Sequence, residues 1–580
     1  MRYHLKRQYA IDSSIVPAQR ALTDLYYGKT LLKKLAEAVR TGEKILIYGD
    51  YDADGIMATY ILYSALDRLS PGKISWFIND RFDDGYNITI DSMKKCLEKN
   101  PDIRVLITCD NGINAVEAVD YAMAQGVTVL VTDHHVQTRP LRGDCPAVDE
   151  RSMKQIGRDK EAGVEAEAFC GAELARRVAE ALFDHLGEAE ENRDFLESLY
   201  TYAALATITD NVPMNPSNHA LARKGLHMIR RGNGIWGLLK EGFFEEDLKK
   251  GRDREIHWDT IGFYYGPLIN ASGRLTGKAD SVMNMLLSHG RGDETACREA
   301  IKELIALNEK RKELCEHDDA IAYQIIEENG LAHAPFILVW DERFSEGING
   351  LTAAHITDKY RVPSAVLSPT RNDPQVFKGS ARSVEGCDLI ALLTTHGERI
   401  RAGGHAMAAG LSIDKKDLET VRTLLMKEMN GFAAPPDPEP DFVHPVSALT
   451  MQIADWYRNL IEELEPFGPG FEEPRVEFHG ETYAVWGKKK KDTEEFVHAG
   501  FPLPMSKDRY FVNANWWNHL AEAKAWFDRA PTLRTETDRY GQTRTWKALR
   551  CRGKLEKNEY TDKYGVPKTT LQITIEKILN

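Results

Sequence analysis

The chain has 580 residues, a formal net charge of −13 and 42% hydrophobic residues. At about 150 residues per domain, this length predicts three or four domains, and no apolar run reaches the roughly 18 residues that a membrane span needs. The acidic balance counts against a uniformly basic nucleic-acid binder, but carboxylates that hold metal ions also contribute negative charge.

The termini and the cysteines indicate a compartment. The first residues, MRYHLKRQYAIDSS, are partly basic but are followed by no apolar segment, so we expect no secretory signal and a cytoplasmic location. Eight cysteines are scattered and none forms a C-x-x-C pair, which excludes a zinc ribbon or a redox motif of that kind. Their spacing fits a reducing compartment.

The first part of the chain alternates apolar runs with helix-like stretches. Strands are predicted at 44–50, 74–80, 105–110 and 127–135. Helices are predicted at 55–69, near 90–98 and near 114–124. Short β-branched runs separated by helices are typical of a parallel sheet wound with helices, so an α/β domain is expected over 1–292.

The remaining chain changes character several times. Residues 195–232 look helical, and the charged stretch 293–330, which ends in Gly, predicts one long helix connecting two domains. A second, smaller α/β domain is expected over 331–432. The Pro- and acid-rich stretch 433–441 reads as a linker. The C-terminal region, 433–580, is then a β-rich domain with a helix near 516–528.

Acidic and imidazole side chains follow three of the predicted strands. Parallel strands of such a sheet bind ligands outside their carboxyl ends, where these clusters fall. A fourth candidate of the same kind occurs in the motif TITDNVP. The candidates are Asp50, Asp52, Asp54, Asp110, Asp133, His134, His135 and Asp210.

This combination of residue types points to a metal centre. So many carboxylates would repel one another without a cation, and oxygen ligands with imidazole suit Mn²⁺, Mg²⁺ or Fe²⁺ better than structural zinc. Two ions about 3.5–4 Å apart could share a carboxylate, activate a water and neutralise a phosphoryl oxygen. That chemistry hydrolyses phosphodiesters or phosphoanhydrides. The sequence has no P-loop, G-x-S-x-G or H-E-x-x-H motif.

Each residue also has a plainer interpretation. A single Asp after a strand is more often a turn or helix-capping residue, and Asp54 could cap the helix that follows it. A pair of histidines is more often a surface feature. Three acidic strand ends in chain order, one of them with tandem histidines, favour the metal site.

With these motifs the chain resembles the DHH phosphoesterase superfamily and, within it, the RecJ type of single-strand-specific exonuclease. YGDYDADGIMAT, TCDNGI, TDHH and ATITDNVPM resemble the metal-binding motifs, and FINDRFDDGY and GPLINASGRL resemble other stretches of the catalytic domain. FSEGING, FKGSARSVEG and RAGGHAMAAGL resemble the associated DHHA1 domain. PFGPGFEEP is similar to the start of an oligonucleotide-binding (OB-like) β-barrel.

The resemblance implies roles for individual residues. Two Mn²⁺ or Mg²⁺ ions would be held by Asp50, Asp52, Asp54, Asp110, His134 and Asp210. The catalytic residues would be His135 beside the scissile phosphate, Asp133 as its orienting partner, and Asp110. The DNA strand would be bound by Arg81, Asn270, Ser272, Arg274, Ser380, Arg382, Gly403, Gly404 and His405.

The activity that the resemblance implies is a 5′→3′ exonuclease in DNA repair or recombination. It would degrade single-stranded DNA to 5′-mononucleotides as a monomer, with single-strand-binding protein or a helicase as candidate partners and no membrane. Two alternatives stay open: an oligonucleotide or cyclic-dinucleotide phosphodiesterase, and an inactive replication scaffold. The lysine run 488–491 is either an exposed loop or, with nearby tryptophans, a surface for single strands.

Overall fold

The computed structural model describes residues 21–85, 87–162, 168–251, 253–371, 373–433, 439–489, 496–504, 511–517, 519–537, 542–561 and 567–580. The chain forms two compact units. The first contains Met1–Pro436 and Gly468–Phe471, and the second contains Asp437–Phe467 and Glu472–Asn580. In the described part of the chain, no helix is both long and apolar enough to cross a membrane.

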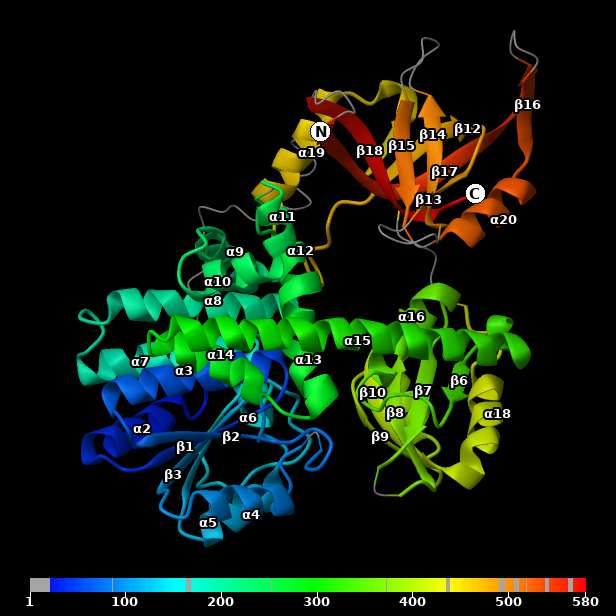
Figure 1. The fold of residues 1–580 in the computed structure, drawn as a ribbon. Helices are drawn as coiled ribbons and strands as arrows, with labels where there is room; N and C mark the ends of the chain where they lie inside the picture. Colours follow the sequence, from blue (N-terminus) through cyan, green and yellow to red (C-terminus); the bar gives the residue numbers. More distant parts are fainter. Residues whose placement is uncertain are drawn as a thin grey trace. The chain divides into compact units, whose positions relative to one another are not determined.

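A parallel sheet forms the N-terminal part of the first unit, as predicted (Figure 1). Its order is β2-β1-β3-β4-β5, with parallel pairing throughout. The strands are β1 (Ile45–Gly49), β2 (Ile74–Ile78), β3 (Val105–Cys109), β4 (Thr128–Thr132) and β5 (Ala147–Val148). β1 and β3 are buried at every residue, which explains their unbroken apolar sequence.

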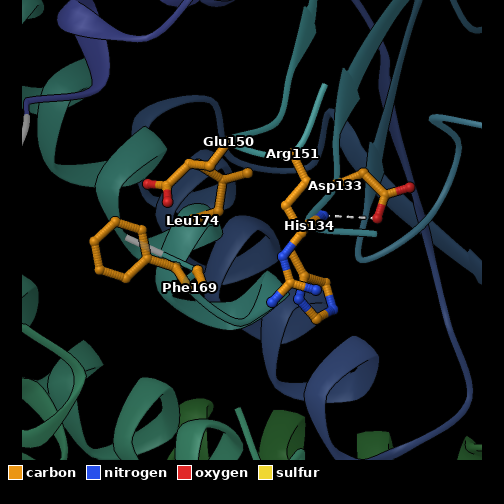
Figure 2. A pocket seen from close by; sticks show the side chains of 7 residues that line it. Asp133, His134, Glu150, Arg151, Phe169 and Leu174 are labelled. Carbon is orange, nitrogen blue, oxygen red and sulfur yellow. Dashed lines mark hydrogen bonds between the residues drawn. The ribbon is translucent and has the colours of Figure 1, made fainter. Parts of the chain in front are cut away.

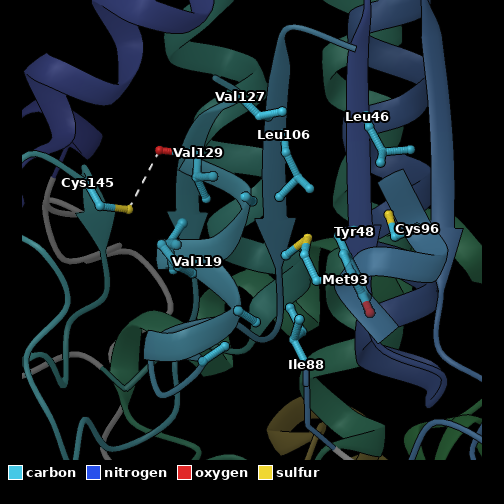
Figure 3. Packing of buried hydrophobic residues seen from close by; sticks show 14 of the residues in the cluster. Leu46, Tyr48, Ile88, Met93, Cys96, Leu106, Val119, Val127, Val129 and Cys145 are labelled. Atoms are coloured by element: carbon cyan, nitrogen blue, oxygen red, sulfur yellow. Dashed lines mark hydrogen bonds between the residues drawn. The ribbon is translucent and has the colours of Figure 1, made fainter. Parts of the chain in front are cut away.

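One face of this sheet is covered by α4 (Ile90–Lys99) and α5 (Val116–Ala124). Leu46, Leu106 and Val129 of the strands pack with Met93 and Val119 of the two helices in one buried cluster (Figure 3). This core fixes the strands, and with them the residues at their carboxyl ends.

Further helices complete this part of the unit. α3 (Ala53–Leu69) packs against α7 (Gly171–Leu186) and α8 (Arg193–Thr209). The helical stretch predicted over 195–232 is divided into α8 and α9 (Pro216–Arg230), because Pro213 lacks the N–H that would continue α8 and Pro216 occupies the first turn of α9. The remaining helices are α2 (Gly28–Thr41), α6 (Met153–Ala162), α10 (Ile235–Phe243), α11 (Glu245–Lys249), α12 (Trp258–Thr260), the π-helix η2 (Ile261–Tyr265), α13 (Gly266–Thr276) and α14 (Asp280–Gly290).

The long connecting helix is confirmed as α15 (Glu294–Glu328), 35 residues without a break. Its first turn is capped by the Asp293 side chain, which accepts from the backbone N–H of Ala296. At 1.5 Å per residue this helix is about 50 Å long. It leads from the helices around α14 to the second sheet (Figure 1).

The second sheet of this unit is mixed, with the order β6-β7-β8-β10-β9. β6 and β7 are parallel, and the other neighbours are antiparallel. Its strands and helices are β6 (Ile337–Trp340), α16 (Asn349–Tyr360), β7 (Ser364–Pro369), β8 (Val376–Arg382), α17 (Leu389–Thr394), β9 (Ile400–Gly404), β10 (Ala408–Asp414) and α18 (Leu418–Glu428). A second, smaller α/β module is therefore confirmed.

The second unit is β-rich, as expected, with a helix at α20 (Leu520–Arg529) and another at α19 (Met451–Leu464). Its strands are β11 (Phe442–Pro445), β12 (Val476–Thr482), β13 (Trp486–Lys489), β14 (Phe496–Pro504), β15 (Phe511–Trp516), β16 (Thr532–Thr537), β17 (Thr543–Thr561) and β18 (Pro567–Ile578). They form one mixed sheet. The side chains of the lysine run 488–491 lie outside the described residues. The OB-like assignment stays a prediction.

A buried cluster of charged side chains at the start of α7 gives a prediction for the stability of the first unit. Glu173 is fully buried and pairs with Arg176 at 2.7 Å and Arg177 at 2.8 Å. Glu173→Ala leaves two buried guanidinium groups without this carboxylate and should lower the free energy of unfolding by about 3–5 kcal/mol. Glu180→Ala removes an exposed partner of Arg176 and should cost less than about 1 kcal/mol. Equal losses in urea unfolding would contradict this assignment.

Candidate metal centre

The carboxyl edge of the parallel sheet gathers the predicted ligands. Asp50 follows β1, Asp110 follows β3, and His134 follows β4, whereas Asp210 follows helix α8 rather than a strand. Their ligand atoms form overlapping groups, within each of which all atoms lie within 4.8 Å of one another. The groups are Asp50–Asp52–Asp110, Asp110–His134–His135 and Asp54–His134–Asp210.

The shared members of these groups fit a pair of cations. Nε2 of His134 lies 2.9 Å from Oδ1 of Asp110, 3.7 Å from Oδ2 of Asp54 and 3.9 Å from Oδ2 of Asp210. Oδ1 of Asp110 is buried and makes no hydrogen bond within the described residues. Carboxylate and imidazole donors that converge in this way match the ligands of Mn²⁺ and Mg²⁺.

The raised pKa values of the buried aspartates also favour bound cations. Burial, and then the charge of Asp52, raise the pKa of Asp50 to about 8 and that of Asp54 to about 7. Burial, and then the charge of Asp54, hold the pKa of Asp110 and of Asp210 well above the usual range. Cations between the carboxylates would remove this penalty and keep them ionised.

The two histidines of the TDHH motif are chemically unequal. Burial and the charge of His135 lower the pKa of His134 to about 3, so its ring is neutral and its lone pair is available to a metal. Burial opposes the charge on His135, but the charge and hydrogen bond of Asp133 outweigh it and raise the pKa to about 10. In the metal-free site, the nearby carboxylates therefore favour the protonated form of His135.

Asp133 is occupied in holding this loop. Its Oδ1 accepts from the backbone N–H of His134 at 2.7 Å and of His135 at 3.1 Å, and lies 2.8 Å from Nδ1 of His135. Its Oδ2 accepts from the backbone N–H of Ile113 at 2.9 Å. Burial opposes ionisation of Asp133, but the nearby His135 outweighs it and lowers the pKa to about 2. The carboxylate orients His135 and has no oxygen left unused.

The aspartates of the first acidic motif have different roles, and the interpretation of Asp54 as a helix cap is wrong. Asp52, not Asp54, caps helix α3, with Oδ1 accepting from the backbone N–H of Gly55 at 3.1 Å. Asp54 lies inside the first turn and is buried. Its two oxygens accept from the backbone N–H groups of Gly171 and Ala172, each at 2.7 Å. These groups begin α7, where a helix end is partially positive and favours a carboxylate.

Gly171 also fits tightly against the centre. A β-carbon at this position would lie 2.5 Å from the β-carbon of Asp110, so only glycine allows α7 to start here. Neither Gly171 nor Ala172 belongs to a motif recognisable in the sequence, and their role depends on a tertiary contact across more than a hundred residues.

Three of the arginines predicted to bind the strand lie together. Burial, and then the charges of Arg81, Arg382 and Arg311, lower the pKa of Arg274 to about 10. Burial and the charge of Arg81 also lower the pKa of Arg382. None of these arginines forms an ion pair with a described residue. An anion placed among these arginines would reduce their mutual repulsion.

The predicted substrate-binding residues of the second sheet lie in different surroundings. A β-carbon on Gly350, at the start of α16, would lie 3.0 Å from Nη2 of Arg382 and 3.2 Å from Oγ of Ser380, so these two side chains line one spot. The rings of His135 and His405 are nearly parallel, with centroids 6.3 Å apart. Gly403 and Gly404 end β9 and are exposed, and φ of Gly404 is 140°.

Asn270 and Ser272 are engaged inside the protein. Oδ1 of Asn270 accepts from the backbone N–H of Ala53 at 2.9 Å, between two of the candidate ligands. Oγ of Ser272 donates to the backbone carbonyl of Lys278 at 2.7 Å, and the side chain is buried. Both residues hold α13 in place, which in turn positions Arg274.

A further cation was not predicted from the sequence. Arg151 lines a small pocket with Asp133, His134 and Glu150, and lies beside the His134 ring (Figure 2). Its charge contributes to the lowered pKa of His134. It follows β5 in a stretch without a recognised motif, so only the fold reveals its position.

Comparison with known proteins identifies the two α/β modules of the first unit. Residues 44–207 match the DHH family, N-terminal domain, and residues 332–431 match the DHHA1 domain. The chain belongs to the DHH family. Its metal-ligand candidates before Asp210 all lie within the matched DHH domain, and Ser380, Arg382 and His405 lie within the matched DHHA1 domain.

Curated relatives of this DHH protein carry one name, single-stranded-DNA-specific exonuclease RecJ. The chain is 30% identical over 458 residues to the Bacillus subtilis protein, covering 77% of this chain and 53% of that one. It is 30% identical over 405 residues to the Haemophilus influenzae protein (67% and 66%) and 28% over 469 residues to the Escherichia coli protein (77% and 76%). The chain thus spans from about half to three quarters of these relatives.

Solved structures show the same fold. The structure of RecJ from Thermus thermophilus in complex with Mn²⁺ matches 99% of this chain and 75% of that chain, with a TM-score of 0.73 and 22% identity. A structure of exonuclease RecJ bound to manganese matches 73% of this chain and 97% of that chain, with a TM-score of 0.56 and 25% identity.

The raised pKa of Asp50 gives a prediction for the metal-free protein. Its folded pKa, about 8, exceeds the ordinary value of 3.8, so the folded state binds an extra proton between these values and the contribution of Asp50 to stability falls as pH rises. In EDTA, Asp50→Asn should therefore be stabilised relative to the native chain, by about 1–3 kcal/mol more at about pH 8 than at about pH 6.

With excess Mn²⁺ the order should reverse, because the neutral amide is a poorer ligand than a carboxylate. Thermal unfolding across this pH range measures both effects, with Asp144→Asn as the exposed control. A stability difference that does not change with pH would show that Asp50 is not a strained, buried carboxylate.

Proposed function

We propose that this protein is a metal-dependent exonuclease that hydrolyses single-stranded DNA from the 5′ end to 5′-mononucleotides. The proposal rests on a carboxylate cluster and an arginine cluster that both lie near Tyr51. The backbone N–H of Tyr51 donates to Oδ1 of Asp50 at 2.8 Å, while the Arg81 guanidinium carbon lies 5.4 Å from the Tyr51 ring centroid. Sites for cations and for phosphates therefore adjoin.

The names of the relatives support the choice of substrate and metal. Curated relatives are called single-stranded-DNA-specific exonucleases, and structures of Thermus thermophilus RecJ were solved in complex with Mn²⁺ and with Mg²⁺. In this chain two such ions would be held by Asp50, Asp52, Asp54, Asp110, His134 and Asp210. When bound, a pair of ions lowers the pKa of water and neutralises phosphoryl oxygens.

The protein's own residues bind and orient the substrate. His135, charged and fixed by Asp133, would donate a hydrogen bond to an oxygen of the scissile phosphate, with His405 opposite it. Arg81 and Arg382 would each grip a phosphate near the 5′ end with two bonds, aided by Ser380. The exposed Gly403–Gly404 segment would allow close approach of the strand to the backbone.

The resemblance also supports a cellular setting. We place the protein in the cytoplasm as a monomer in DNA repair or recombination, with single-stranded DNA as its ligand and with single-strand-binding protein or a helicase supplying that DNA. The β-rich second unit, here assigned to DNA binding, favours a long substrate over a dinucleotide. The complete set of Asp and His ligands favours catalysis over a scaffold role.

One digestion experiment tests this function. Single strands labelled at the 5′ or the 3′ end are incubated with Mn²⁺ or Mg²⁺, and the 5′ label should appear first as a mononucleotide. Loss of an outer partner of a metal ligand typically costs 10–100-fold, so Asp110→Ala and His134→Ala should each cost more than roughly 100-fold. Asp144→Ala, an exposed carboxylate of the same domain, should retain full activity.

Other outcomes would each contradict part of the proposal. Early release of the 3′ label would reverse the polarity. Cleavage of dinucleotides without cleavage of long strands would indicate the phosphodiesterase alternative, and no hydrolysis of either would indicate a scaffold.

A further inference from the structure

A cavity of about 120 Å³ lies beside helix α13. It lies among η2, α13, α15 and α16, and its polar lining comes from Thr209, Asn270, Arg274 and Arg311. One water needs roughly 10–15 Å³ of such space, so the cavity can hold a group of several heavy atoms. No acidic side chain is among its lining residues in the described part of the chain.

Two of the lining residues connect the cavity to the candidate ligands. Thr209 directly precedes Asp210. Asn270 accepts a hydrogen bond from Ala53, which lies between Asp52 and Asp54. These two residues therefore connect the cavity lining to the metal centre.

The π-helix η2 shapes the opposite wall. Gly262 of η2 and Gly266, the first residue of α13, line the cavity, and a β-carbon on Gly266 would lie 2.5 Å from Cγ2 of Thr209. π-Helical turns are rare and frequent at functional sites. Here the turn brings glycine backbone against the end of α8, next to the ligand Asp210.

The two charged residues that line the cavity, Arg274 and Arg311, are both positive. Arg311 projects from the middle of the connecting helix, and its Nε donates to Oδ1 of Asn308 at 2.9 Å. Asn308 is buried, so this bond fixes the guanidinium plane. Neither Arg311 nor Arg274 forms an ion pair with a carboxylate among the residues described. Two cations facing one cavity repel each other unless an anion lies between them.

Arg311 also extends the arginine cluster. Arg81, Arg382 and Arg311 all act electrostatically on Arg274, which makes Arg274 their common neighbour. A polyanion that engages Arg81 and Arg382 can therefore meet Arg311 through its next charged group. A nucleic-acid strand carries such a series of charged groups, one phosphate per nucleotide.

We infer that this cavity is a second phosphate subsite, in which Arg311 and Arg274 bind a backbone phosphate of single-stranded DNA adjacent to the scissile one. The inference rests on the proposed function and adds Arg311, on the connecting helix, to the substrate-binding residues. Arginine suits the task because its planar fork grips a phosphate with two bonds. Such a contact positions a strand without reading its bases.

The test combines a variant with neutralised phosphates. 5′-Phosphorylated single strands carry one uncharged methylphosphonate at successive positions, and the first cleavage is timed with Mn²⁺. On the unmodified strand, Arg311→Ala should lower kcat/KM roughly 10–100-fold, the range for a hydrogen bond to a charged group. At the one position that Arg311 contacts, the methylphosphonate should slow cleavage by the native chain by a similar factor. It should not slow cleavage by Arg311→Ala beyond the loss that this variant already shows on the unmodified strand.

Controls separate binding from folding. Lys312→Ala removes a charge from the same helix, where Lys312 is paired with Glu309, and should cleave like the native chain. If Arg311→Ala does not fold, Arg311→Lys serves instead, with a smaller loss confined to the same position. Mn²⁺ affinity should stay unchanged in either variant.

Two results would overturn the subsite. The effects of Arg311→Ala and of the methylphosphonate could multiply at every position, or the variant could lose Mn²⁺ affinity as well as rate. A native chain that cleaves no single strand would instead remove the proposed function, and this subsite with it.

Discussion

Repulsion among buried carboxylates governs the first unit. A parallel sheet brings the residues that follow its strands to one edge, and in this chain those residues are mostly aspartates. Their charges are offset in two ways. The start of α7 supplies two N–H groups to Asp54, while the remaining oxygens converge on positions suited to cations. Metal binding and the local fold therefore depend on each other.

Residues at this edge of the sheet differ in charge according to their neighbours. His134 is kept neutral, whereas His135 is kept charged by Asp133, so one ring suits a metal and its neighbour suits a phosphate. Beyond Tyr51 the arginines lie close together without ion-pair partners among the described residues. The DHHA1 domain adds His405 opposite His135. A phosphodiester, the substrate proposed above, would contact the bound metal ions on one side and the arginines on the other.

Local sequence patterns predict much of the parallel sheet and of the metal centre. Apolar runs followed by acidic motifs placed β1, β3 and β4 and the residues after them, because strand formation and chain order require only short-range information. The role of Asp54 is harder to predict from the sequence. Asp52 and Asp54 are both spaced to cap a helix, and only the fold shows that Asp52 does so. Gly171, Arg151 and Arg311 could not be predicted, since their positions at the site depend on contacts between segments distant in the chain.

Anomalous diffraction from crystals grown with Mn²⁺ would measure the metal centre directly. Two peaks about 3.5–4 Å apart are expected at the carboxyl edge of the parallel sheet, with Asp110 contacting both ions and His134 one of them. Asp133 should contact neither, because its oxygens are used by the backbone and by His135. A single peak, or peaks away from Asp110 and His134, would contradict the two-metal centre on which the proposed hydrolysis depends.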